Sequence, residues 1–100
     1  MAWAFEVELT RAACGHLEAQ RRYDRNAILD AIKEQLTDTP AQETRNRELL
    51  REDALSDWEL RVGRFPVFQD VDARNRVVRI LAVSIREGNK LIIGGEEVTL

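Results

Sequence analysis

Three consecutive runs decide the fold of this 100-residue chain: Trp58-Glu-Leu-Arg-Val-Gly-Arg-Phe-Pro-Val-Phe-Gln-Asp-Val-Asp72, Arg76-Val-Val-Arg-Ile-Leu-Ala-Val-Ser-Ile-Arg86 and Gly88-Asn-Lys-Leu-Ile-Ile-Gly-Gly95. Apolar, β-branched and aromatic residues fill these runs, and turn-forming residues separate them. The pattern predicts an antiparallel meander of three strands followed by a short fourth strand. Because the run 77–85 is too apolar for an edge strand, we expect it to lie centrally in the sheet.

The residues before Trp58 are expected to cover this sheet. Residues Trp3 to Leu9 alternate between apolar and polar side chains. This period of two predicts a further strand that is apolar on one face and acidic on the other. Thr10 is suited to cap a first helix, which the sequence predicts over residues 11–23.

A second helix is predicted from a cap at Asp24 to about Thr37. Its apolar residues recur at helical spacing and form one face: Ile28, Ile32 and Leu36. Almost no linker separates the two helices, so we expect an antiparallel hairpin packed on one face of the sheet. The order of strand, two helices and then three or four strands indicates an α+β fold with a mostly antiparallel four-stranded sheet.

Composition indicates one globular domain over residues 1–100, since a chain of this length builds a single modest core. No apolar run approaches the roughly 18 residues of a membrane span, and residues 1–6 lack the features of a signal peptide. Cys14 is the only cysteine, so neither an internal disulfide nor a cysteine metal site is expected. We expect a cytoplasmic protein without metal or cofactor.

Arginine dominates the positive charge, with 13 of the 15 cations, although the net charge is −3. The guanidinium is a good fork for phosphates and carboxylates, but a GC-rich genome would favour arginine as well. A net negative chain disfavours strong non-specific binding of nucleic acid. Any such contact must therefore come from a local patch. Within residues 44–64, five arginines face five acids, which is typical of a solvated, salt-bridged surface.

Residue motifs alone do not identify an activity. The chain contains no Gly-rich phosphate loop, no HExxH motif and no serine or cysteine triad. His16, the only histidine, is expected to be a surface or half-buried helix residue rather than a general base. Cys14 is interpreted as a packing residue.

A resemblance extends this interpretation. It rests on the order and spacing of several motifs: Thr44-Arg-Asn-Arg47, Trp58-Glu-Leu-Arg-Val-Gly63, Val67-Phe68, Asp70-Val71-Asp72, Val77–Val83, Arg86, Gly88-Asn89 and Ile93-Gly-Gly-Glu-Glu97. Together they resemble the RelE branch of the RelE/ParE superfamily, over nearly the whole chain. The family consists of toxins of bacterial type II toxin–antitoxin pairs, and RelE cleaves mRNA in the ribosomal A site.

The resemblance implies a metal-independent endoribonuclease that inhibits translation. In such a nuclease, cations position the phosphate and stabilise charge while the RNA's own 2′-hydroxyl attacks. The resemblance gives this catalytic role to Arg86, Arg64 and Arg61, and substrate contacts to Arg45, Arg47 and Lys90. It also implies a cognate antitoxin, the ribosome and mRNA as partners, and no direct DNA binding by this chain. Three aromatic residues would be candidate anchors for the antitoxin if they were exposed: Trp3, Trp58 and Phe68. As strand residues, however, they are expected in the core.

The sequence departs from the family pattern at several positions. Pro66 stands where the family has an arginine, and Arg64, on the same strand face, is the candidate to replace it. Ile92 stands at the position of an aromatic residue, and Gln69 at that of a common tyrosine. Some relatives use a carboxylate as base, but Glu48 is expected to be an exposed loop acid. These departures leave two alternatives open: a ParE-like protein that poisons DNA gyrase by binding, and an inactive toxin that only binds its antitoxin.

Overall fold

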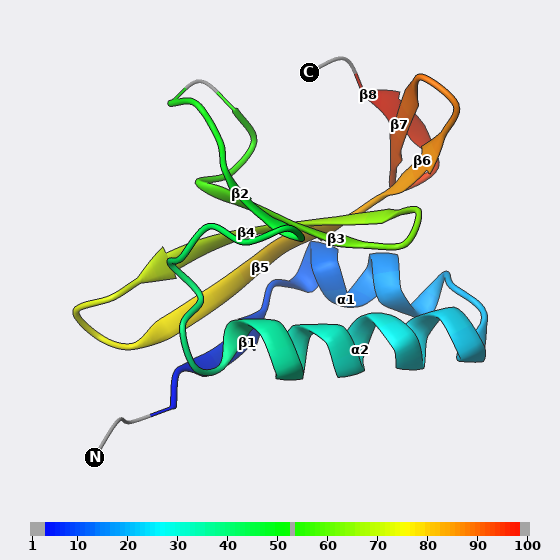
Figure 1. Ribbon diagram of the computed structural model, residues 1–100. Coiled ribbons are helices and arrows are strands. Elements are labelled where there is room, and N and C mark those ends of the chain that lie inside the picture. Colours follow the sequence, from blue (N-terminus) through cyan, green and yellow to red (C-terminus); the bar gives the residue numbers. More distant parts are fainter. Residues whose placement is uncertain (1–3, 53, 99–100) are drawn as a thin grey trace.

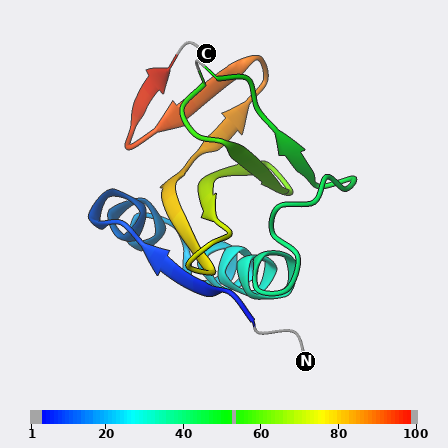
Figure 2. The same cartoon turned by 90° about the vertical axis from the view of Figure 1, so that its left-hand side faces the viewer.

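A five-stranded sheet carries both helices on one face, and a small second sheet extends beyond one end of it (Figures 1 and 2). The computed structural model describes residues 4–52 and 54–98. The main sheet has the order β1-β5-β4-β3-β2, with β1 parallel to β5 and the other neighbours antiparallel. This architecture confirms the α+β class. The elements are β1 Glu6–Leu9, α1 Arg11–Glu18, α2 Arg22–Leu36, β2 Arg47–Leu49, β3 Trp58–Val62, β4 Phe65–Asp72, β5 Val77–Val83, β6 Ile85–Glu87, β7 Lys90–Ile93 and β8 Glu96–Val98.

The meander predicted from Trp58 onwards is β3-β4-β5, and β5 lies inside the sheet between β1 and β4. The strand ends at Val83 rather than continuing through residue 85. Ser84 donates its backbone N–H and its hydroxyl to the carbonyl of Pro66, at 2.9 and 2.7 Å, but Pro66 has no N–H to donate in return, so the ladder is incomplete here. The chain then leaves the main sheet as β6.

The predicted number of strands in the main sheet was wrong. The polar segment before Trp58 contributes β2, which pairs with the edge of β3. The run 88–95 does not join the main sheet but forms a second sheet in which β7 pairs with β6 and β8. Its turns explain this local folding, since Gly88, Gly94 and Gly95 adopt positive φ values of 62°, 61° and 84°, which tight hairpins favour.

The two helices lie side by side and run in opposite directions, as predicted (Figure 1). Thr10 caps α1 by accepting the backbone N–H of Ala13 at 3.2 Å. The helix ends at Glu18 instead of residue 23, and α2 begins at Arg22, so Asp24 lies in its first turn and is not its cap. The apolar stripe of α1 ends at Leu17, which leaves nothing for a longer helix to bury. Neither helix in the described part of the chain is long and apolar enough to cross a membrane.

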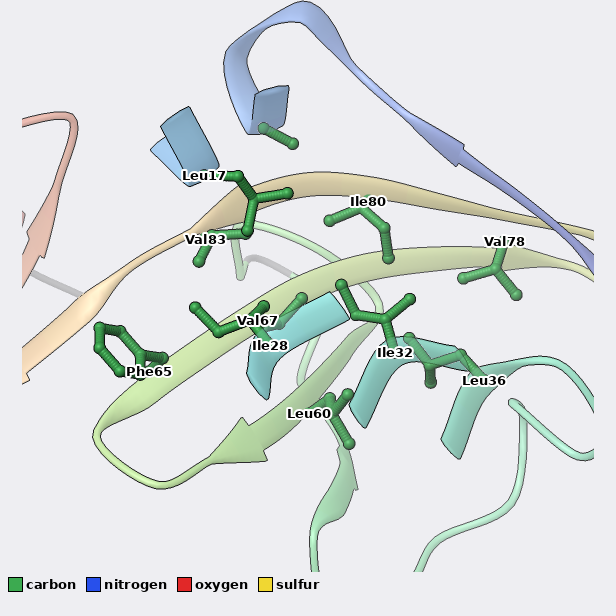
Figure 3. Packing of buried hydrophobic residues seen from close by; sticks show 11 residues of the cluster. Leu17, Ile28, Ile32, Leu36, Leu60, Phe65, Val67, Val78, Ile80 and Val83 are labelled. Atoms are coloured by element: carbon green, nitrogen blue, oxygen red, sulfur yellow. The ribbon is translucent and has the colours of Figure 1, made fainter. Parts of the chain in front are cut away.

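The core lies between the helices and the main sheet (Figure 3). The predicted apolar face of α2 is buried there and packs against strand residues such as Leu60, Val67 and Ile80. Trp58 and Phe68 are 7% and 0% exposed, so neither is available as an antitoxin anchor. Trp3, the first residue of the predicted N-terminal strand, lies outside the described residues, and β1 begins at Glu6.

Candidate functional site: an arginine cluster at one end of the sheet

The fold brings together the three arginines that the resemblance named as catalytic. Gly63 adopts a φ of +58° in the two-residue turn between β3 and β4, and this turn presents Arg64. Arg61 lies directly opposite Pro66 in the β3–β4 register. The backbone N–H of Arg86 donates to the carbonyl of Arg64 at 2.8 Å. Arg61, Arg64 and Arg86, which we call the arginine cluster, therefore come from neighbouring backbone segments at one end of the main sheet.

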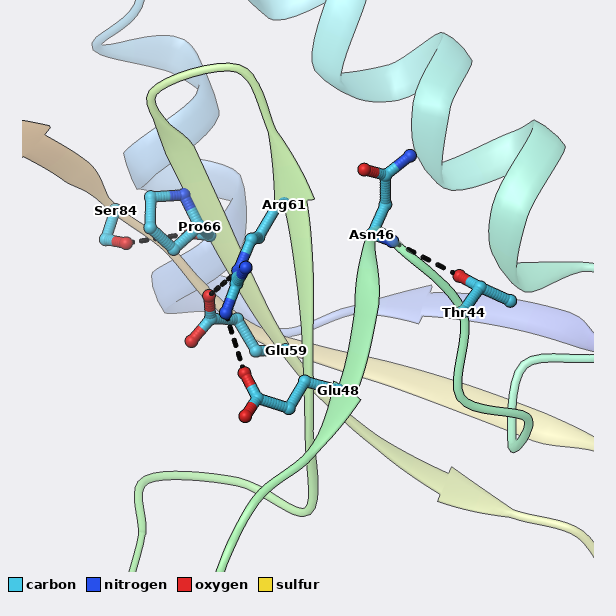
Figure 4. A network of polar contacts seen from close by, with 7 residues as sticks. All are labelled: Thr44, Asn46, Glu48, Glu59, Arg61, Pro66 and Ser84. Atoms are coloured by element: carbon cyan, nitrogen blue, oxygen red, sulfur yellow. Dashed lines mark hydrogen bonds and ion pairs between the residues drawn. The ribbon is translucent and has the colours of Figure 1, made fainter.

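Arg61 lies between two carboxylates (Figure 4). Its Nη2 is 2.8 Å from Oε2 of Glu48, and its Nε is 3.4 Å from Oε2 of Glu59. The Arg61 side chain is nevertheless 56% exposed. Glu48, expected in a loop, is in fact on β2, where its side chain is 51% exposed. The guanidinium thus remains reachable from solvent while its own chain partly neutralises it.

Arg64 and Arg86 are exposed, and their backbones are paired next to the segment that carries Arg61. The guanidinium carbon of Arg64 lies 5.4 Å from the ring centroid of Phe65, at cation–π distance. Charged guanidinium groups on neighbouring backbone segments are suited to bind the oxygens of a phosphate. The arrangement can hold an anionic backbone and stabilise charge that develops on it.

The position at which the resemblance implies an arginine is occupied by a buried, uncharged ring. Pro66 lies in β4 and its carbonyl accepts two hydrogen bonds from Ser84. It therefore fastens β4 to the junction of β5 and β6. Arg64 lies two residues before Pro66 and is exposed at the turn. Along β4 and the turn before it, Arg64 is the cation nearest to Pro66.

The position of the missing aromatic residue lies on the other face of the second sheet. Ile92 pairs with Ile85, whereas Arg86 pairs with Leu91. Because neighbouring residues of a strand point to opposite faces, Ile92 and Arg86 face in opposite directions. An aromatic side chain at residue 92 would therefore not approach the arginine cluster.

The three residues predicted to contact substrate differ in their exposure to solvent. Arg45 and Lys90 are exposed. Arg47 is only 7% exposed, and its Nη1 donates to the carbonyls of Gln35 and Thr39 at 2.6 and 2.5 Å. The prediction that Arg47 contacts substrate was therefore wrong, because its guanidinium is used to fasten β2 to the end of α2.

A cleft beside His16 was not expected from the sequence. Its volume is about 430 Å³, and it lies between α1 and the second sheet, lined among others by Gln20, Ile85, Ile92 and Gly94. Nδ1 of His16 accepts the backbone N–H of Val83 at 3.2 Å, across 67 residues of sequence. This bond requires a neutral imidazole with its proton on Nε2. No local pattern could have revealed a contact of such long range.

The neutral state of His16 predicts a pH dependence of stability. Burial lowers the pKa of His16 below its ordinary value of 6.5. Below that pH the unfolded chain binds more protons than the folded one, so the free energy of unfolding should fall as the pH drops from about 7.5 to about 5.5. A His16→Asn variant keeps an acceptor but does not titrate, and in urea unfolding it should lose part of this dependence. Equal pH dependence of both proteins would contradict the assignment.

Comparison with known proteins shows which solved structures have a similar fold. Neither protein-family models nor curated proteins match the chain. Among solved structures, a chain of the toxin–antitoxin complex RelBE2 from Mycobacterium tuberculosis matches with a TM-score of 0.72 and 22% identity, covering 83% of this chain and 99% of that chain. This protein has a RelE-like fold. The likeness confirms the fold that the strand motifs implied. Within the RelE-like fold, the arginine cluster is the candidate site on which a function can be argued.

Proposed function

We propose that this protein is the toxin of a toxin–antitoxin pair and that its arginine cluster binds mRNA phosphates in the ribosomal A site. The observation that carries the proposal is the convergence of Arg61, Arg64 and Arg86 at one end of a RelE-like fold. The solved relative belongs to a toxin–antitoxin complex, which supports a cognate antitoxin as a partner here.

The proposed reaction is cleavage of the RNA backbone by its own 2′-hydroxyl. The 2′-oxygen forms a bond to phosphorus, and the bond between phosphorus and the 5′-oxygen breaks. The proton released by the 2′-hydroxyl ends on the 5′-oxygen. The protein contributes orientation and charge stabilisation. In this proposal the arginine cluster holds the phosphate oxygens, and the exposed Arg45 and Lys90 contact neighbouring parts of the strand.

Primer extension on mRNA held on ribosomes with an empty A site tests the proposal. The wild-type protein should cut at defined A-site positions, and Arg86→Ala should reduce the cuts at least about tenfold because a charged phosphate ligand is lost. Arg74→Ala is the matched control, since Arg74 is exposed in the turn after β4, at the opposite end of that strand from Arg64. Absence of cuts at high concentrations of wild-type protein would contradict the nuclease proposal.

The buried Pro66 favours a second candidate, a toxin or former toxin without nuclease activity. Such a protein would poison gyrase by binding, or only bind its antitoxin. Pro66→Arg should discriminate, because it adds a cation directly opposite Arg61. A clear rise in A-site cleavage would support a weakened nuclease site. Inhibition of gyrase supercoiling without any cleavage, in the wild type and in Pro66→Arg, would support the second candidate.

A further inference from the structure

Arg61 is held by its own chain at the atoms that would bind a phosphate. Nη2 contacts Glu48 and Nε contacts Glu59, so the edge of the guanidinium that carries these two donors faces carboxylates (Figure 4). A phosphate that approaches Arg61 therefore meets two negative charges already in place. Because like charges repel, RNA cannot simply be added to this arrangement.

The two carboxylates are not equivalent. Glu59 lies two residues before Arg61 on β3, and its side chain is 7% exposed. Glu48 lies on β2, a strand of three residues at the edge of the main sheet, and its side chain is 51% exposed. Glu48 can rotate into solvent without uncovering the core, whereas Glu59 cannot leave without rearrangement of β3.

The register of the sheet explains why Arg61 is retained between them. Glu48 and Glu59 lie directly opposite each other in the β2–β3 pair. Two like charges in that position destabilise a sheet, and a cation between them relieves the repulsion. The Nη2 group of this cation becomes available to a phosphate when the exposed carboxylate of Glu48 withdraws.

We propose that Glu48 competes with the RNA phosphate for Arg61 and is displaced from Nη2 when RNA binds, while Glu59 stays in contact with Nε. This inference rests on the proposed function of the arginine cluster. It assigns to Glu48 a role in setting affinity, and it makes the strength of RNA binding depend on an acid of β2 as well as on the arginines. A carboxylate that served only as the base of the reaction would have no such effect on affinity.

Binding of a short single-stranded RNA, followed by fluorescence anisotropy at low salt, tests the competition. Glu48→Gln keeps the shape of the side chain and removes its charge. It should bind RNA about two- to fivefold more tightly than the wild type, the range expected for loss of an exposed ion pair. Glu52→Gln is the matched control, because it removes the same charge from an exposed acid four residues further along the chain. This control should bind like the wild type.

A double variant separates competition from a general change of charge. In an Arg61→Ala background, Glu48→Gln should give no gain in affinity, because the guanidinium for which the two anions compete is absent. Equal affinity of Glu48→Gln and wild type, or a gain that persists without Arg61, would overturn the competition. Arg86→Ala should weaken RNA binding whether or not Glu48 competes with RNA. Unchanged binding by Arg86→Ala would contradict the proposed phosphate site. No RNA binding by wild type or Glu48→Gln would overturn both.

Discussion

Arg47→Ala is expected to lower the free energy of unfolding by about 3 kcal/mol. The guanidinium of Arg47 joins two carbonyls near the end of α2, and its Nε donates to the hydroxyl of Thr44 at 3.3 Å. Removal leaves these acceptors without their donor at a partly buried place and loosens β2 from the helix. The planar fork serves several acceptors at once, so Arg47→Lys should recover only part of the loss. Chemical denaturation followed by circular dichroism measures both changes.

Arg45→Ala is the matched control for this prediction. Arg45 lies two residues before Arg47 and is exposed, so its removal should change the free energy of unfolding by less than about 0.5 kcal/mol. The two variants also test whether Arg47 stabilises the fold while Arg45 does not. Unchanged stability of Arg47→Ala would show that the carbonyl contacts of Arg47 contribute nothing to the stability of the fold.

Gln69→Leu should raise the free energy of unfolding by about 2 kcal/mol. The Gln69 side chain is 0% exposed, and neither its amide nitrogen nor its amide oxygen has a hydrogen-bond partner among the residues that the structure describes. Alternation along β4 places it on the same face as Val67 and Val71, opposite Ile80 of β5. An apolar side chain of similar volume removes the cost of the unpaired amide.

Equilibrium unfolding in urea compares Gln69→Leu with Gln42→Leu. Gln42 is exposed, and the same substitution there removes no buried amide, so its effect on stability should stay within about 0.5 kcal/mol. A lower free energy of unfolding for Gln69→Leu would show that the amide makes bonds in solution, for example to water, that outweigh the apolar gain.

Sequence patterns predicted much of this fold because the relevant signals are local. Apolar runs separated by turn residues identified the meander, a period of 3.6 residues identified the apolar face of α2, and Thr10 marked the start of α1. The order of strand motifs from Trp58 onwards implied a RelE-like fold, which the structural likeness confirms. Strand ends were less predictable: the mostly apolar run 77–85 gives no sign that β5 ends at Val83, next to the bond from Ser84 to Pro66.

Local sequence was sufficient to predict both helices, the three-stranded meander and the chemical types at the candidate site, because these depend on neighbouring residues. Only the tertiary structure decided what each side chain does there. Two arginines of one tetrapeptide separate into exposed Arg45 and buried Arg47, since β2 pairs with β3 and carries Arg47 under the end of α2. The contact of Glu48 with Arg61 likewise arises from strand register, which joins residues 13 positions apart. Such pairings depend on long-range packing, and no local pattern encodes them.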